Sequence, residues 1–361
     1  MWGEIGWTWR YMANIARARE CCERGEQILR DVGVITGPAW GRLRYEQSSL
    51  YLVEGRYEEA RRSAREALTF FEQPGLVIET LPTIRSTRIQ STLAGNPVDL
   101  GRVYAYMGPL ASSEGLRTEA LNHLKTALTI FEQYDDKRRI AHVSCNMGNV
   151  YLKKNDYEQA QAVFRRSLNL AEQLGDDPLK SVIYSDFGEL AAATGDLEEA
   201  ERWYRKALEL TALTHDHEYI SAWNAALAAV LQEQGKLEEA ASCIKQALIV
   251  GRAYHLNPCI GIALVALGDF RIKQALNAEA TPVLRRHLLK LAARDLQRAL
   301  ALEGLEAETR TRGHLAFAHV ALLRGERERA RDELTTVAKE AHRYELPRIE
   351  AQARDLLAPI Q

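Results

Sequence analysis

The segments NDYEQA (155–160), GDLEEA (195–200) and GKLEEA (235–240) recur every 40 residues along the chain and determine the fold. Another small residue stands twelve positions before the alanine of each segment, namely Gly148, Gly188 and Ala228. Apolar or small residues follow each alanine at +4, +7 and +8, a spacing that places three side chains on one stripe of a helix. Self-similarity at a fixed period is typical of repeat proteins, so the chain is predicted to stack one unit many times.

Each unit is predicted to hold two helices joined by a short turn. The turn begins at Asn155, Gly195 or Gly235, residue types that tolerate the left-handed conformation at the end of a helix. Asp156 and Asp196 follow and are expected to cap the second helix. The small residues let the two helices cross closely. A larger side chain at the crossing would overpack it, which costs about 1–3 kcal/mol. One pair cannot bury both of its faces, so the sequence predicts an all-α fold, a right-handed α-α superhelical solenoid of about seven helix-turn-helix repeats.

The spacing of these framework residues divides the chain into three parts. We expect an N-terminal helical cap at 1–37, the solenoid at 38–346 and a C-terminal capping helix at 347–361. Departures from the period predict one insertion near 75–95 and a second near 276–289, between the two helices of the sixth repeat.

Two prolines bear on the second repeat. Asn96 followed by Pro97 is typical of an N-cap and the first position of a helix. Pro109 directly follows the small residue of this repeat and is expected to kink or end its helix.

Four of the six tryptophans, Trp2, Trp7, Trp9 and Trp40, lie close to the N-terminus. They fit a helix that packs on the first repeat, and they also fit a surface that contacts another domain or chain. A partner contact through this N-terminal Trp-rich helix is therefore kept as an alternative.

The sixth repeat carries a run of basic residues: Arg285, Arg286, His287, Lys290, Arg294 and Arg298. A solvated helix face explains this run, and a contact for an acidic partner is the alternative. The net charge of the whole chain is −2 and its pI is near 6.5, so no overall field favours nucleic acid or an acidic membrane.

The framework resembles the tetratricopeptide repeat (TPR). The residues that carry the resemblance are Gly148, Tyr151, Ala160, Phe164 and Ser167 in one copy and Gly188, Ala200, Tyr204 and Ala207 in the next. The period is longer than is usual for this repeat and is similar to the longer repeats of kinesin light chains and of sensor regions in bacterial signalling ATPases and maltose-activator-type regulators. The resemblance covers almost the whole chain and implies a protein that binds other proteins or peptides.

The resemblance also implies where a ligand binds, because the first helices of TPR pairs line a concave face. The residues that it places on or near this face are Asn149, Asn146, Lys153, Ser185, Glu189, Asp269, Tyr45, Arg102 and His319. The amide of Asn149 can both donate to and accept from a peptide backbone, although a polar residue on a solvated face is the alternative. Glu189 and Asp269 occupy the slots equivalent to Asn149 and suit a ligand with Lys or Arg.

Catalytic motifs are missing from the sequence, which contains no GxxxxGK[ST], HExxH or GxSxG. The segment HDHE at 215–218 is interpreted as a polar turn, because no distant partner ligands accompany it. Cys145 has no assignable histidine partner, so nucleophilic use is not expected. We therefore expect no catalytic residues, no metal and no cofactor.

These features favour a non-enzymatic TPR scaffold that binds a protein or peptide, either an adaptor or the sensor region of a signalling protein. The alternative is a small-molecule-sensing regulatory domain of a STAND-type ATPase or transcriptional activator. Five cysteines without a CxxC pair, no signal-peptide pattern and no long apolar run favour a cytoplasmic protein that binds neither nucleic acid nor a membrane.

Overall fold

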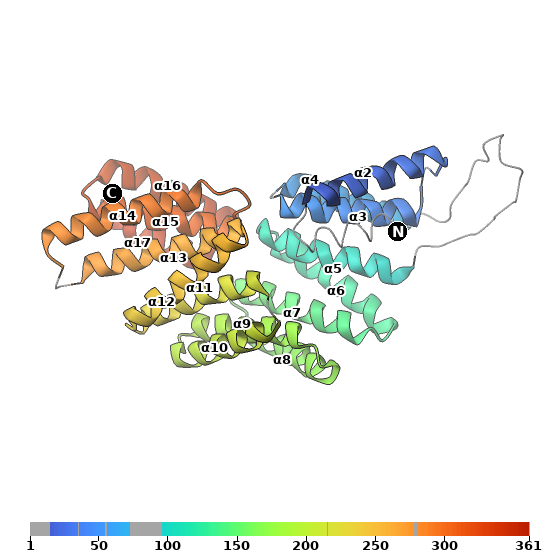
Figure 1. The fold of residues 1–361 in the computed structure, drawn as a ribbon, viewed down its shortest axis with the longest axis horizontal. Coiled ribbons are helices and arrows are strands. Elements are labelled where there is room, and N and C mark those ends of the chain that lie inside the picture. Colours follow the sequence, from blue (N-terminus) through green and yellow to red (C-terminus); the bar gives the residue numbers. More distant parts are fainter. Residues whose placement is uncertain are drawn as a thin grey trace, which may run out of the picture. The chain divides into compact units, whose positions relative to one another are not determined.

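The computed structural model describes residues 15–34, 36–54, 56–72, 96–214, 216–277 and 280–360. These residues form α-helices packed in consecutive pairs, and they include no β-strand (Figure 1). Helix α2 (Ile15–Asp31) precedes seven pairs, and α17 (Pro347–Leu357) follows them with a short 3₁₀ helix, Ala358–Ile360. The fold is a helical repeat solenoid, which confirms the predicted class.

The seven pairs are α3 (Pro38–Val53) with α4 (Tyr57–Glu72), α5 (Pro97–Ser113) with α6 (Arg117–Gln133), α7 (Lys137–Lys153) with α8 (Tyr157–Leu174), α9 (Asp177–Thr194) with α10 (Leu197–Thr214), α11 (His217–Glu233) with α12 (Leu237–Ala253), α13 (Asn257–Leu276) with α14 (Pro282–Leu300), and α15 (Ala307–Leu323) with α16 (Arg327–Arg343). In each pair we call the earlier helix the first helix and the later one the second helix.

The chain divides into two compact units. One comprises Met1–Ala111 and Thr118–Val143, and the other, here the second unit, comprises Ser112–Arg117 and Ser144–Gln361. A continuous apolar core runs through α9 to α15 within the second unit. None of the described helices combines the length and the apolar character that a membrane-spanning helix needs.

Two of the expectations fall on parts of the chain that the structure does not describe. Trp2, Trp7 and Trp9 lie outside the described residues, and so does the insertion near 75–95. The assignment of caps to 1–37 and 347–361 stays a prediction.

The turns within the pairs have the conformation that the sequence predicts. Asn155, Gly195 and Gly235 have positive φ angles of 60°, 88° and 78°. The aspartate that follows caps the second helix: Asp196 accepts a hydrogen bond of 3.0 Å from the backbone N–H of Glu199, and the aspartate of the preceding repeat does the same. These caps satisfy amides that the start of a helix leaves unpaired.

The small residues lie where the paired helices touch. A Cβ atom added to Gly148 would lie 2.2 Å from the ring of Phe164, and one added to Gly188 would lie 3.0 Å from the ring of Tyr204. In the first repeat the small residue is Ser48, whose hydroxyl donates a 2.5 Å hydrogen bond to a backbone carbonyl of α4. Larger side chains at these positions would push the helices apart.

Pro109 does not end its helix, so that part of the expectation was wrong. Helix α5 continues for four residues beyond Pro109. A proline in a helix interior costs about 3 kcal/mol, because it removes a backbone hydrogen bond and crowds the preceding turn. Packing offsets this cost, since Leu110 and Ala111 are each only 2% exposed. Asn96 begins the helix as predicted, accepting a 3.0 Å hydrogen bond from the N–H of Val98.

The insertion predicted between the two helices of the sixth repeat mostly lengthens those helices instead. We compare this pair with α9 and α10. Helix α13 extends two residues further past its framework glycine, Gly268, and the link that follows is three residues longer. Helix α14 starts seven residues further ahead of its framework alanine, Ala292. The early start has a local cause: Thr281 accepts a 3.2 Å hydrogen bond from the N–H of Leu284, and Pro282 takes the first helical position. The residues predicted as an insertion near 276–289 are thus distributed over the end of α13, the link and the start of α14.

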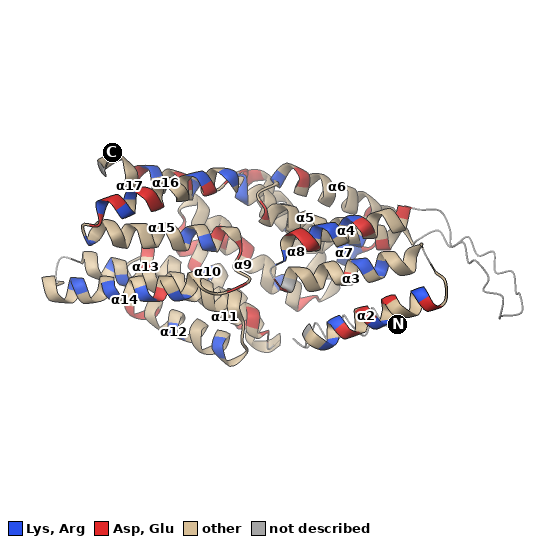
Figure 2. Ribbon diagram, turned by 90° about the horizontal axis from the view of Figure 1, so that it is seen from above, with Lys and Arg blue, Asp and Glu red and all other residues tan. Residues whose placement is uncertain are grey.

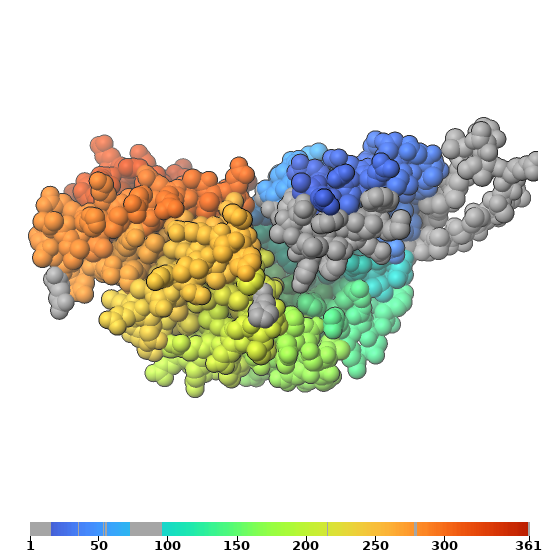
Figure 3. Space-filling view, in the orientation of Figure 1, coloured from blue at the N-terminus to red at the C-terminus, as the bar shows by residue number. Residues whose placement is uncertain are grey.

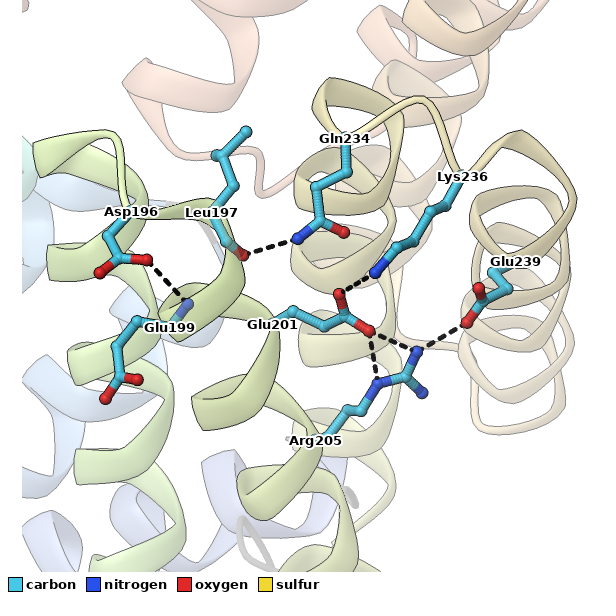
Figure 4. Close-up of polar contacts among 8 residues, drawn as sticks. All are labelled: Asp196, Leu197, Glu199, Glu201, Arg205, Gln234, Lys236 and Glu239. Atoms are coloured by element: carbon cyan, nitrogen blue, oxygen red, sulfur yellow. Dashed lines mark hydrogen bonds and ion pairs between the residues drawn. The ribbon is translucent and has the colours of Figure 1, made fainter.

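Successive repeats of the second unit are joined through both sets of helices. The first helices contact one another in order, α9 with α11, α11 with α13 and α13 with α15. Among the second helices, a polar cluster ties α10 to α12 and to the turn before it (Figure 4). Lys236 Nζ lies 2.6 Å from the carboxylate of Glu201, and Arg205 lies 2.7 Å from both Glu201 and Glu239. Such partly exposed pairs contribute up to about 1 kcal/mol each.

The last helix of the second unit also contacts the start of that unit. Arg348, at the beginning of α17, lies 3.0 Å from the hydroxyl of Tyr157 and donates to the backbone carbonyl of Ala193. Arg117, which is 2% exposed, pairs with Glu345 at 3.0 Å. The second unit is therefore held together by contacts between distant repeats as well as between neighbours.

Candidate ligand-binding site on the first helices

The predicted site residues fall in different units. Tyr45 and Arg102 lie on α3 and α5 in the first unit, where the guanidinium carbon of Arg102 is 5.6 Å from the centre of the Tyr45 ring. Tyr45 also packs edge-on against Tyr106, with ring centres 5.5 Å apart. The other seven predicted residues belong to the second unit.

Polar side chains from four first helices form what we call the inner charged cluster of the second unit. Its members are Asn149 and Lys153 on α7, Asp186 and Glu189 on α9, Asp269 on α13, and Glu308 and Arg312 on α15. Lys153 Nζ lies 3.9 Å from Glu308 Oε2, although three complete helix pairs lie between their repeats along the chain. The cluster therefore spans the third to the seventh repeat.

Asp186 is the buried member of this cluster. Its residue surface is 7% exposed, and its carboxylate accepts a hydrogen bond from Cys145 Sγ at 2.9 Å. Burial raises the pKa of Asp186 to about 7, and Glu189 adds to the rise, against hydrogen bonds from Cys145 and Asn149 that lower it. Burial also raises the pKa of the Cys145 thiol well above its usual value, so Cys145 is a hydrogen-bond donor and not an activated nucleophile.

Two further carboxylates of the cluster have a raised pKa. Solvent reaches Glu189, yet desolvation by the surrounding helices raises its pKa, and Glu308 raises it further against the nearby cations. Desolvation raises the pKa of Asp269 to about 6, although Arg312 and Lys273 lower it. The ionised forms of these groups are therefore not fully compensated by the charges around them.

Lys153 and Glu308 differ from these carboxylates because each has an opposite charge close by. Burial lowers the pKa of Lys153, but Glu308, Glu306 and Glu189 raise it more. Burial likewise raises the pKa of Glu308, but Lys153 and Arg312 reverse that shift and leave the pKa lowered. Both groups are charged near neutral pH.

The remaining predicted residues of the second unit have less polar surface to offer. Ser185 is buried and donates a 2.8 Å hydrogen bond to the carbonyl of Val182 in its own helix. Burial lowers the pKa of His319, so its imidazole is neutral near pH 7. Asn146 is half-buried on α7, one turn before Asn149.

Three members of the cluster were not predicted: Asp186, Glu308 and Arg312. A signal for Asp186 exists, because it follows Asn146 by one full period and so occupies the same slot of the repeat. Glu308 and Arg312 precede the framework residue Ala318 by more than one helical turn. Neither stands at a position of the repeat that the sequence pattern defines. Only the fold shows that they approach Lys153.

The polar turn near residue 216 has a structural explanation. Asp216 caps α11 by accepting a 3.2 Å hydrogen bond from the N–H of Tyr219. The ring of His217 stacks on Tyr254 with centres 3.7 Å apart. Within the described ranges, no group of three or more His, Cys, Asp or Glu side chains is arranged to hold a metal ion.

A separate cavity of about 680 Å³ lies between α16, α17 and the final 3₁₀ helix. Its lining consists of Thr335, Ala338, Lys339, His342, Glu350, Arg354, Leu357 and Ala358. The one carboxylate in this lining, Glu350, already pairs with Arg354 and with His342. None of the predicted site residues lies there.

The arrangement of helices is similar to that in several solved structures. A Rap protein complexed with Competence and Sporulation Factor shares 14% identity, covers 90% of this chain and 76% of its own, and gives a TM-score of 0.56. The Rap conjugation gene regulator of plasmid pLS20 in complex with the Phr* peptide shares 14%, with 84% and 74% covered and a TM-score of 0.58. The apo quorum sensor NprR from B. thuringiensis shares 14%, with 94% and 86% covered and a TM-score of 0.57. These similarities establish the fold.

Sequence comparison identifies the family. No curated protein matches the chain. The family model of the MalT-like TPR region matches residues 101–295, which is more than half of the sequence. This range includes the three regular repeats and reaches into α14. The chain therefore belongs to the family of MalT-like TPR regions.

Proposed function

We propose that the inner charged cluster binds a peptide or protein segment that carries a Lys or Arg side chain, and that this chain is a regulatory or adaptor protein without catalytic activity. The observation that carries the proposal is the composition of the cluster, in which four carboxylates from three first helices (Asp186, Glu189, Asp269 and Glu308) lie beside only two cations of the cluster, Lys153 and Arg312; the raised pKa of Asp186, Glu189 and Asp269 agrees with this excess. A bound cation would supply the compensation that these carboxylates lack, and would favour their ionised forms.

Asn149 supports a peptide as the class of ligand. Its side chain bonds to Asp186 on one side. An amide has two donors and one acceptor oxygen, so it retains groups for a peptide backbone. The Rap regulator of similar fold was solved with the Phr* peptide, which agrees with a peptide ligand.

A binding selection tests the charge preference. Immobilised protein is incubated with a pool of random short peptides, and the retained peptides are sequenced. We expect enrichment of Lys and Arg, and we expect Glu189→Gln with Asp269→Asn to weaken binding of an enriched peptide about tenfold. Glu198→Gln with Glu238→Gln is the matched control, because both residues are exposed on second helices and the charge change is the same. Enrichment of acidic peptides, or equal affinity in the first variant, would contradict the proposal.

The same peptide should bind more tightly as the pH rises. Asp269 and Asp186 lose protons as the pH passes about 6 and about 7, so the cluster gains negative charge. Titration calorimetry on either side of this range should show stronger binding at the higher pH. Asn149→Ala should weaken binding about fivefold at the higher pH, because it removes the amide offered to the peptide and also a hydrogen bond that favours the ionised form of Asp186.

A second candidate is a small-molecule sensor region of a larger regulator, which the match to the MalT-like TPR region favours. Thermal-shift screening with a panel of metabolites separates the two. Stabilisation by a neutral metabolite, unchanged in the Glu189→Gln and Asp269→Asn variant, would support the sensor and not the peptide site.

A further inference from the structure

Helix α14 presents a stripe of positive charge that faces away from the core. Arg286, Lys290, Arg294 and Arg298 recur at every fourth position and are all exposed. Residues four apart lie on the same side of a helix, so these cations follow one line along α14. Figure 2 shows Lys and Arg recurring along this helix. We call these four residues the α14 stripe.

The stripe departs from the charge pattern of the other second helices. The position two residues before the framework alanine is Glu158 in α8, Glu198 in α10, Glu238 in α12 and Glu328 in α16, but Lys290 in α14. Acidic residues in the first turn of a helix are favoured by the helix dipole. In α14 this position lies in the helix interior, because the helix already begins at Pro282, so the dipole does not favour an acidic residue at Lys290.

Three of the four cations of the stripe lack the carboxylate partners that cations have on other helices, and the fourth, Arg294, lies 3.7 Å from Asp295. On α10, Arg202 pairs with Glu199, and Arg205 pairs with Glu201. Among the described residues, no carboxylate lies within 4.0 Å of Arg286, Lys290 or Arg298. The stripe's positive charge is thus available to another molecule.

Exposed aliphatic side chains stand at one end of the stripe. Val283 is 69% exposed, Leu284 46% and Leu276 50%. They sit where the lengthened α13–α14 hairpin turns, which is the left end of the second unit in the space-filling view (Figure 3). Exposed apolar side chains that lie together mark interaction sites, and Arg is enriched at protein interfaces.

We propose that the α14 stripe docks an acidic helical segment of a partner protein, with the aliphatic residues at the hairpin turn as its apolar anchor. Regularly spaced Arg and Lys match Glu or Asp at the same spacing on a facing helix, and Arg clusters recognise acidic segments. The site is separate from the inner charged cluster and does not depend on the peptide proposed there.

The width of the stripe favours a narrow protein segment over a membrane or a duplex. Glu238 on α12, and Glu328 with Asp332 on α16, are exposed on the second helices before and after α14. Exposed cations accompany these carboxylates, Lys245 on α12 and Arg327 on α16, so the flanking helices carry mixed charge and the continuous line of positive charge is confined to α14. Helix α14 contains no Phe, Tyr or Trp on which the bases of a single strand could stack.

The test is fluorescence anisotropy with a labelled synthetic helical peptide that has Glu at every fourth position and two Leu residues at one end. We expect binding at low salt that weakens at physiological salt, and no binding of the same peptide with Gln in place of Glu. The variant Lys290→Glu with Arg298→Glu should weaken binding about tenfold or more. The variant Arg202→Glu with Lys206→Glu changes the charge equally on α10 and should leave binding unchanged.

Three results would overturn the proposal. The first is no binding of the acidic peptide to the unaltered protein. The second is an equal loss of affinity in the α10 variant, which would mean that net charge and not the stripe is recognised. The third is binding of phosphatidylcholine–phosphatidylglycerol vesicles but not of the peptide, which would assign the stripe to a membrane. Circular dichroism of both variants checks that they are folded, which we expect because the substituted positions are exposed.

Discussion

The hydrogen in place of a side chain at Gly148 fixes how closely α7 and α8 approach each other. Because a Cβ atom there would lie 2.2 Å from Phe164, Gly148→Ala should lower the free energy of unfolding by about 1–3 kcal/mol. The loss should exceed the roughly 1 kcal/mol that alanine gains over glycine in a helix. Denaturant titration measures the difference.

Gly188→Ala is the matched control for this change. Its Cβ atom would lie 3.0 Å from the edge of the Tyr204 ring, a contact that a small ring movement relieves. We therefore expect little or no loss of stability. If Gly188→Ala were the more harmful of the two, the packing of these helix pairs would differ from that described.

Single residues also show why part of the charged cluster could be predicted. Asn149, Glu189 and Asp269 share one slot of the repeat, so their common face follows from the sequence. Asp186 shares the slot of Asn146 and could have been found in the same way. The shift in the pKa of Asp186 could not have been predicted, because it depends on burial and on a hydrogen bond from Cys145, which only the packed structure provides.

At the scale of the helix, α5 contains an internal proline, Pro109, that destabilises the helix around it. Pro109 is exposed and inside the helix, so Pro109→Ala removes little packing and restores the backbone N–H. We expect the free energy of unfolding to rise by up to about 3 kcal/mol, measured by denaturant titration.

Pro97→Ala provides the comparison. Pro97 occupies the first position of α5, where the amide has no partner within the helix. Its replacement should change stability little. A loss of stability in Pro109→Ala, or an equal gain in Pro97→Ala, would show that the internal proline is not the source of strain.

Helix boundaries were predictable where a cap accompanied the pattern and were missed where the period alone was followed. Asn96 with Pro97 was recognised as the start of α5. Thr281 with Pro282 has the same chemistry, but the break in period there indicated only extra residues between the two helices. The cap decides the boundary because it satisfies the first backbone amides, which a count of residues ignores.

At the scale of the second unit, contacts between distant repeats add to those between neighbours. Arg348 binds Tyr157 and the carbonyl of Ala193. Arg348→Ala should accelerate amide hydrogen exchange at the end of α9 and in the turn after it, with a loss of about 1 kcal/mol or less in global stability. Arg354→Ala is the control, because Arg354 pairs with Glu350 in its own helix. Equal exchange in the two variants would contradict a role for Arg348 in this contact.

The sequence could not predict these distant contacts. A repeat pattern specifies which helix follows which, and each repeat of a solenoid is expected to contact its neighbours. Whether the seventh repeat contacts the third depends on the small rotations between successive repeats, summed over the repeats that lie between them. The pairing of Lys153 with Glu308 is therefore a property of the folded unit, whereas the helix pairs, their turns and their close crossings follow from the residues themselves.

The contact made by Arg348 has a mechanical consequence. An open solenoid stretches like a spring, because each interface between neighbouring repeats opens slightly under force. Here a pulling force on the second unit would first load the bonds from Arg348 and from Lys153, which bridge its extremities. The unit should resist small forces stiffly, then lengthen abruptly once these bridges break.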